Sequence, residues 1–222
     1  MEISFIGHAC FRLRGRDAAV VIDPYGKALG LPTLQPSRFT ADIVAVTHDH
    51  PGHNNVAMVG GSPRVVDGPG EYDIKGVGLR GVHAYHDDAR GEKLGRVTMF
   101  AIEIDDLVVA HLGDLGHPPT EGQQEQLGSI DVLLIPVGGG QAMTATEAAA
   151  VANQLEPKVV IPMHYRLPGL RPQLDDPTHF AKEMGIQAIE YQPKLSLSGK
   201  PSSDEIKVVF LEARATSGAL VG

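Results

Sequence analysis

Three closely spaced histidines form the chemically distinctive segment of this chain, Thr47-His48-Asp49-His50-Pro51-Gly52-His53. In an extended chain His48 and His50 project to the same side, and a turn at Pro51-Gly52 can return His53 beside them. Converging neutral imidazoles suit zinc, manganese or iron. Because an apolar strand runs directly into this segment, we interpret it as a metal site rather than as a solvated histidine-rich loop.

Three further candidate ligands, His86, Asp114 and His164, each follow a predicted strand later in the chain. Loops at the carboxyl ends of strands are where sites are commonly built. His86 is preferred to His83, because His86 begins a loop whereas His83 ends a strand. Together with the first three histidines, these residues supply enough donors for two metal ions that share one aspartate.

The elements that must position these residues are short strands followed by alternating helices and strands. We predict helices over 144–155, capped by Thr144 with Glu147 three residues on, and over 177–184. This order favours two sheets with helices outside them over a single doubly wound sheet. The predicted strands are 3–6, 10–13, 18–23, 43–46, 64–67, 76–82, 97–104, 107–112, 131–137, 158–163 and 206–211.

The composition of the chain limits the number of domains, the class of partner and the cellular location that we expect. The chain has 222 residues with 42% hydrophobic content, which predicts one folded domain over 1–222. Its net charge of -8 disfavours nucleic acid as the partner. The lone cysteine, Cys10, cannot form an internal disulfide and is expected to be a core residue. With no signal-peptide pattern and no span-length apolar run, the sequence predicts a cytoplasmic protein that does not bind membranes.

The chain as a whole resembles the metallo-β-lactamase superfamily of metal-dependent hydrolases. The resemblance rests on the His-x-His-x-x-His motif, His86, Gly113-Asp114 and the segment 161–165. The opening Phe5-Ile6-Gly7-His8-Ala9-Cys10-Phe11 is similar to the branch that contains L-ascorbate-6-phosphate lactonase. The resemblance implies an α/β fold, a four-layer αββα sandwich with the metals at one end. It also implies that His48, His50 and His86 hold one metal, that His53 and His164 hold the other, and that Asp114 bridges them.

One position departs from the superfamily pattern, which usually has aspartate before the last histidine of the motif, where this chain has Gly52. The missing carboxylate predicts a weaker second metal, whose occupancy Gly52→Asp would raise. Glu71, which follows a glycine-rich turn, could return a carboxylate to the site, or it could be a solvated turn residue. His8 could line the pocket as a proton donor, or it could be a hydrogen-bonded structural histidine.

The expected function is hydrolysis of a small ester, lactone or phosphoester by a metal-activated water, with His8 and Glu71 as candidate catalytic residues. The expected cofactor is one or two divalent ions, zinc or manganese first and iron next. The expected partner is a small-molecule substrate, and self-association into a homo-oligomer is left open. The alternatives are a phosphodiesterase or nuclease, a di-iron redox protein, and a metal-binding protein without turnover.

Overall fold

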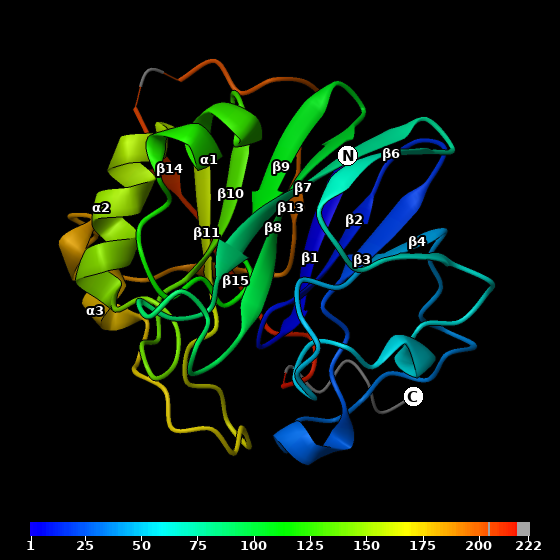
Figure 1. Cartoon of the computed structure of the whole chain (residues 1–222), viewed down its shortest axis with the longest axis horizontal. Coiled ribbons are helices and arrows are strands. Elements are labelled where there is room, and N and C mark those ends of the chain that lie inside the picture. Colours follow the sequence, from blue (N-terminus) through cyan, green and yellow to red (C-terminus); the bar gives the residue numbers. More distant parts are fainter. Residues whose placement is uncertain (204, 217–222) are drawn as a thin grey trace.

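Two mixed β-sheets packed face to face make up the body of the structure, a computed structural model that describes residues 1–203 and 205–216 (Figure 1). The six-stranded sheet has the order β13 (Leu195–Ser196), β1 (Glu2–Gly7), β2 (Cys10–Arg14), β3 (Ala19–Ile22), β4 (Ile43–Ala45) and β5 (Arg64–Val66). The seven-stranded sheet has the order β14 (Lys207–Val208), β11 (Val159–Met163), β10 (Val132–Pro136), β9 (Leu107–His111), β8 (Arg96–Ile104), β7 (Val77–Tyr85) and β6 (Gly70–Ile74). A small third sheet pairs β12 (Tyr191–Gln192) with β15 (Phe210–Leu211).

Strand direction decides where the connecting loops meet. In the first sheet β3 and β4 are parallel, and β1 runs the same way as β3 because each is antiparallel to β2. In the second sheet β9, β10 and β11 are parallel, and β7 runs with them because both β7 and β9 are antiparallel to β8. Every strand that precedes a candidate ligand therefore ends at the same edge of its sheet.

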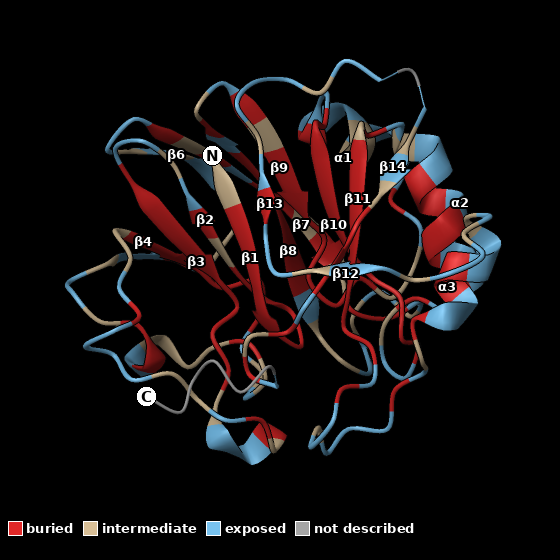
Figure 2. Cartoon of the chain, turned by 180° about the vertical axis from the view of Figure 1, so that it is seen from behind, coloured by how far each residue is buried: buried red, intermediate tan, exposed pale blue. Residues whose placement is uncertain are grey.

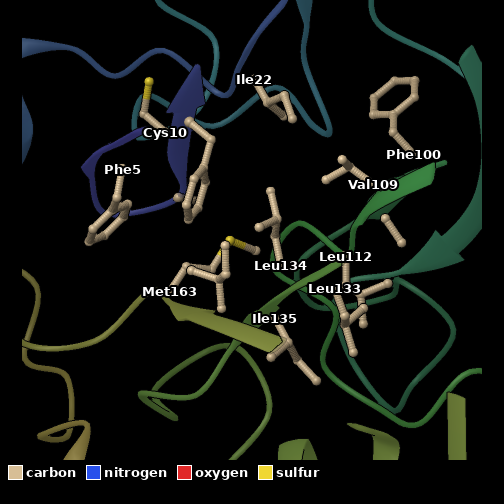
Figure 3. Packing of buried hydrophobic residues seen from close by; sticks show 14 of the residues in the cluster. Phe5, Cys10, Ile22, Phe100, Val109, Leu112, Leu133, Leu134, Ile135 and Met163 are labelled. Atoms are coloured by element: carbon tan, nitrogen blue, oxygen red, sulfur yellow. The ribbon is translucent and has the colours of Figure 1, made fainter. Parts of the chain in front are cut away.

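The core lies between the two sheets. Figure 3 shows Phe5 and Ile22 of the first sheet facing Leu134, Val109 and Met163 of the second. Successive residues of a strand face opposite sides, so Leu133 and Ile135 point away from the sandwich core. They are nonetheless fully buried. A strand that is apolar on both faces requires cover on its outer side as well.

Three helices provide this cover: α1 (Glu121–Leu127), α2 (Ala145–Leu155) and α3 (Thr178–Glu183). They lie beside the seven-stranded sheet, and α2 turns its buried face toward the strands (Figure 2). Thr144 caps α2 in a reciprocal capping box with Glu147, as predicted. None of the helices in the described part of the chain is long and apolar enough to cross a bilayer.

The predicted sandwich of two sheets with outer helices is confirmed. The helical layer beside the six-stranded sheet is reduced to short turns. In the segment from β1 to β5, the described residues form no helix other than the 3₁₀ turns η1 (Lys27–Leu29) and η2 (Val56–Met58). The prediction missed α1, the polar edge strand β6 and the short strands β12 and β13, and its strand over 206–211 is divided between β14 and β15, which belong to different sheets. The spacing of Thr120 and Gln123, which form a capping box, could have identified α1.

Candidate metal centre

Six of the predicted site residues lie together at the edge of the sandwich where the parallel strands end. His48, His50 and His53 follow β4, His86 follows β7, Asp114 follows β9, and His164 follows β11. His8 joins them from the turn between β1 and β2. All but His50 are buried, and His50 is half-buried. The fold thus gathers donors from segments far apart in sequence into one small volume.

The carboxylate of Asp114 lies at the centre of this group. Its Oδ2 atom is 3.0 Å from His53 Nε2 and 3.2 Å from His164 Nε2. The same oxygen is 3.6 Å from His86 Nε2 and 3.8 Å from His48 Nε2. One carboxylate oxygen therefore faces four imidazole nitrogens, as expected of a group shared between two cation positions.

Two separate sets of donors lie close together. One consists of His48, His50 and His86, whose ligand atoms lie within 4.8 Å of one another. The other consists of His8, His53, Asp114 and His164, within the same limit. Spacings of this size suit donors around one small ion, since metal–nitrogen bonds are about 2 Å long.

Several polar atoms of these residues have no hydrogen-bond partner in the described structure although they are buried. They are His48 Nε2, both ring nitrogens of His86, Asp114 Oδ1, and the Nδ1 atoms of His8 and His164. Leaving one such group unpaired costs about 1–3 kcal/mol. Buried imidazoles and a carboxylate without partners are the donor set that a divalent cation would satisfy, so the residues fit a metal.

Asp23, which sequence reasoning missed, supports two of the histidines from outside. Its Oδ2 accepts hydrogen bonds from His53 Nδ1 at 2.8 Å and from the Thr47 hydroxyl at 2.7 Å, and its Oδ1 accepts from the Thr47 backbone N–H at 2.8 Å. The Thr47 hydroxyl is also 2.9 Å from His48 Nδ1. Because this hydroxyl donates to Asp23, His48 Nδ1 must donate to it. Both histidines therefore carry a proton on Nδ1, which leaves Nε2 as the nitrogen of each ring that would bind metal.

The buried carboxylates and imidazoles of the centre shift one another's pKa values. Burial would lower the pKa of His53, but Asp114 and Asp23 on either side overcome this effect and raise it to about 10. Burial would raise the pKa of Asp114, but His164 and His53 hold it well below its ordinary value. Burial, reinforced by His53, lowers the pKa of His48 to about 3. Ionised carboxylates thus lie beside the neutral imidazole of His48, whereas His53 keeps a proton that a bound cation would displace, because imidazole binds metal in its neutral form.

His111 is not part of the centre, but it hydrogen-bonds to the backbone on either side of it. Its Nε2 donates to the carbonyl of Ala9, next to His8, at 2.9 Å. Its Nδ1 accepts from the backbone N–H of Gly113, next to Asp114, at 3.0 Å. Both ring nitrogens are therefore occupied, which makes His111 a positioning residue, in keeping with the supporting role expected for metal-site neighbours.

A cavity of about 300 Å³ opens onto the centre. Its floor includes His8, His50, His53, Asp114 and His164. Its walls are Leu29, Gly52, Gly140, Gln141, Pro172, Gln173 and Leu174. The triple-glycine loop contributes through Gly140, while Gly138 packs so tightly that an added Cβ would lie 2.2 Å from the carbonyl oxygen of His164.

Glu71 does not join the centre, so of its two predicted roles the return of a carboxylate to the site, and with it the catalytic role, is wrong. It lies on the edge strand β6 opposite Arg80 of β7, and the two side chains form an ion pair at 3.3 Å. The Glu71 side chain is 81% exposed. The extended stretch from Arg80 to His86 spans roughly 20 Å at about 3.3 Å per residue, so strand geometry keeps this carboxylate away.

The other histidines also lie outside the centre. His83 faces a separate surface hollow with Glu71 and Arg80, so His86 is the histidine of this loop that joins the centre. His117 Nδ1 contacts the carbonyl of Pro118, and His179 is exposed on α3. Of the remaining expectations, Asp49 is exposed and accepts from Asn54, and Cys10 is a fully buried core residue.

Comparison with known proteins places this geometry in a family. Residues 2–164 match the family described as the Beta-lactamase superfamily domain. A UPF0173 metal-dependent hydrolase of Pelotomaculum thermopropionicum is 31% identical over 211 residues, which cover 81% of this chain and 90% of that protein. A UPF0173 metal-dependent hydrolase of Thermococcus onnurineus is 29% identical over 215 residues, covering 85% of this chain and 94% of that protein.

A crystal structure of a protein from Thermotoga maritima is similar to this chain in fold and assigns it to the same superfamily. It is that of a candidate Zn-dependent hydrolase of the metallo-β-lactamase superfamily, 37% identical in sequence, with a TM-score of 0.76. The match covers 95% of this chain and 99% of the other. The chain belongs to the UPF0173 family of metal-dependent hydrolases within the metallo-β-lactamase superfamily.

Proposed function

We propose that the centre binds two divalent cations and hydrolyses a small, uncharged ester or lactone in the adjoining cavity. The observation that carries this proposal is the position of Asp114, whose Oδ2 lies between the Nε2 atoms of His48, His53, His86 and His164 at 3.0–3.8 Å. Such an arrangement gives both cation positions a common carboxylate.

The metal ions and the residues of the chain would contribute in different ways to hydrolysis. When bound, the cations supply Lewis acidity that lowers the pKa of water and polarises the scissile carbonyl. Asp23 holds the Nδ1 protons of His53 directly and of His48 through Thr47, which fixes both rings. Fixed donors need no reorganisation during the reaction, and this preorganisation is a large part of catalysis.

The volume and the lining of the cavity indicate the size and charge of the substrate. A volume of about 300 Å³ is at the low end for ligand pockets, so it suits a small molecule rather than a polymer. Gln141 and Gln173 offer neutral hydrogen-bonding groups, and Leu29, Pro172 and Leu174 offer apolar contact. Within the described part of the chain, the residues lining the cavity include no lysine or arginine.

The sequence resembles a branch that contains a lactonase of a phosphorylated sugar, and the cavity lining can be compared with what a phosphate group requires. Phosphorylated substrates are usually recognised by arginine or lysine. A cavity with a neutral wall therefore favours a lactone or ester without a phosphate group over a sugar phosphate or a phosphodiester. The phosphoester reading remains the second candidate, because the metal centre alone could neutralise one phosphate.

The test is metal analysis combined with turnover. The purified chain, loaded with zinc, is assayed on a panel of aliphatic lactones, aryl esters and bis(p-nitrophenyl) phosphate. His50→Ala, at the half-buried position, should lower hydrolysis by at least about 100-fold, the upper end of the loss caused by removing only a ligand's supporting partner. The matched control, His179→Ala on α3, should retain the wild-type rate.

Three outcomes would contradict the proposal. Preferential turnover of the phosphodiester would favour the second candidate. Metal binding without turnover of any member of the panel would indicate a binding protein. Activity that persists in His50→Ala at the level of His179→Ala would show that the centre does not carry the reaction.

A further inference from the structure

We propose that His8 is a ligand of the second metal ion and occupies the place of the aspartate that this chain lacks at Gly52. The inference rests on the proposed function, because it requires that the centre binds metal. It adds a ligand and explains how the second cation position can be complete although Gly52 has no side chain.

The first argument is the position of the imidazole. A donor atom of His8 lies within 4.8 Å of the donor atoms of His53, Asp114 and His164. The ring centroid of His8 is 4.3 Å from that of His164 and 5.0 Å from that of His53. The side chain is buried and lines the cavity. Its donor atom is therefore grouped with those of the predicted ligands His53, Asp114 and His164.

The second argument is the space beside Gly52. A Cβ atom at this position would lie 3.2 Å from His8 Nε2 and 3.4 Å from His8 Cδ2. The His8 ring thus fills the volume into which a side chain at residue 52 would project. Glycine at position 52 and histidine at position 8 are complementary, since a larger residue 52 would displace this ring.

The third argument is the backbone of His8. Its φ of 58° is in the left-handed region, which is uncommon for residues other than glycine. Its carbonyl accepts the backbone N–H of His164 at 2.8 Å, and His164 is itself left-handed with φ 52°. Strained residues of this kind persist where the surrounding structure holds them, often at functional sites. Here one hydrogen bond holds two strained histidines against the same cation position.

The fourth argument is the lack of any other partner for the ring. His8 Nδ1 is buried and makes no hydrogen bond within the described residues. A structural histidine such as His111 has both nitrogens satisfied. Nδ1 of His8 therefore lacks the hydrogen bond expected of a structural histidine and retains the capacity to coordinate.

With His8 included, the two cation positions become alike. Each would be served by three imidazoles, and both would share Asp114, whose Oδ2 lies 3.0–3.8 Å from imidazole nitrogens of both sets. Imidazole-rich sites suit zinc, whereas manganese prefers carboxylate oxygen. Exchange of the aspartate for histidine therefore predicts a centre that selects zinc over manganese at both positions.

The test compares zinc content and cobalt spectra of the full chain. His8→Asn removes the imidazole, and asparagine tolerates the left-handed backbone. After reconstitution and dialysis, the wild type should hold about two zinc ions per chain and His8→Asn about one, with loss of part of the visible absorption of the cobalt form. The control His179→Asn should match the wild type. If His8→Asn does not fold, His8→Gly, which relieves the backbone strain, takes its place.

A rescue experiment tests the replacement itself. Gly52→Asp alone should not increase the zinc content, because the new side chain would collide with His8. Gly52→Asp combined with His8→Asn should restore the second ion. Full zinc content in His8→Asn, or a failure of Gly52→Asp to restore zinc in His8→Asn, would overturn the assignment of His8 while leaving the proposed hydrolysis intact. A wild type that binds no metal, or that binds it without turnover, would instead contradict the proposed function.

Discussion

Replacement of Asp23 by asparagine should disable the metal centre although Asp23 is not proposed to bind metal. The Thr47 backbone N–H points at Oδ1 and cannot reverse, so the amide oxygen of asparagine must take that place. The amide nitrogen then replaces Oδ2 and donates to His53 Nδ1 and to the Thr47 hydroxyl. In response, the proton of His53 moves to Nε2. The Thr47 hydroxyl turns to donate to His48 Nδ1, so His48 also becomes protonated on Nε2.

The expected magnitude follows from this change of tautomer. Both affected Nε2 atoms face Asp114 and the cation positions, and a protonated nitrogen cannot coordinate. Loss of a supporting partner typically lowers metal affinity 10–100-fold, or about 1.4–2.7 kcal/mol. Loss of the buried charge, with weaker hydrogen bonds to the donors, should lower the free energy of unfolding by about 1–3 kcal/mol even without metal.

The assay is zinc affinity by competition with a chromophoric chelator, together with urea unfolding in the presence of EDTA. Asp42→Asn is a matched control, because Asp42 also accepts a backbone N–H, that of Ala19 at 2.9 Å, and a side-chain donor, Lys75. It precedes β4 at the end remote from the centre. Wild-type zinc affinity in Asp23→Asn, or an equal loss in Asp42→Asn, would refute the tautomer argument.

Three further predictions use the same structure. His86→Ala should lose metal and hydrolysis, whereas His83→Ala, the neighbouring histidine outside the centre, should keep both, as measured by zinc content and turnover. Gly138→Ala should lower stability by at least about 1–3 kcal/mol in thermal unfolding and weaken zinc binding, since its Cβ would meet the carbonyl of His164 at 2.2 Å; an unchanged melting temperature would contradict this. Glu71→Gln should leave the zinc content unchanged, and loss of an ion would reinstate Glu71 as a ligand.

The strands could be predicted because their apolar runs are bounded by strong turn signals. Asp105 and Asp106 both have positive φ, 54° and 64°, and form the hairpin turn between β8 and β9. The strand β6 and the helix α1 were missed because they are short and largely polar. Their stability comes from pairing and packing with β7, which hydrophobic periodicity does not record.

Most of the candidate donors could be named from the sequence, because histidines and a carboxylate at strand ends mark a site through residue type and local spacing. The residues that support and complete the site became visible in the folded chain. Asp23 has no neighbouring motif, and the sequence left the role of His8 open; what the two residues do depends on contacts with His53 and His164, which are 30 and 156 positions away. Glu71 was as open a candidate as His8 in sequence, but the register of β6 on β7 pairs it with Arg80. Strand direction and register are set by long-range pairing, and they decide which side chains can meet.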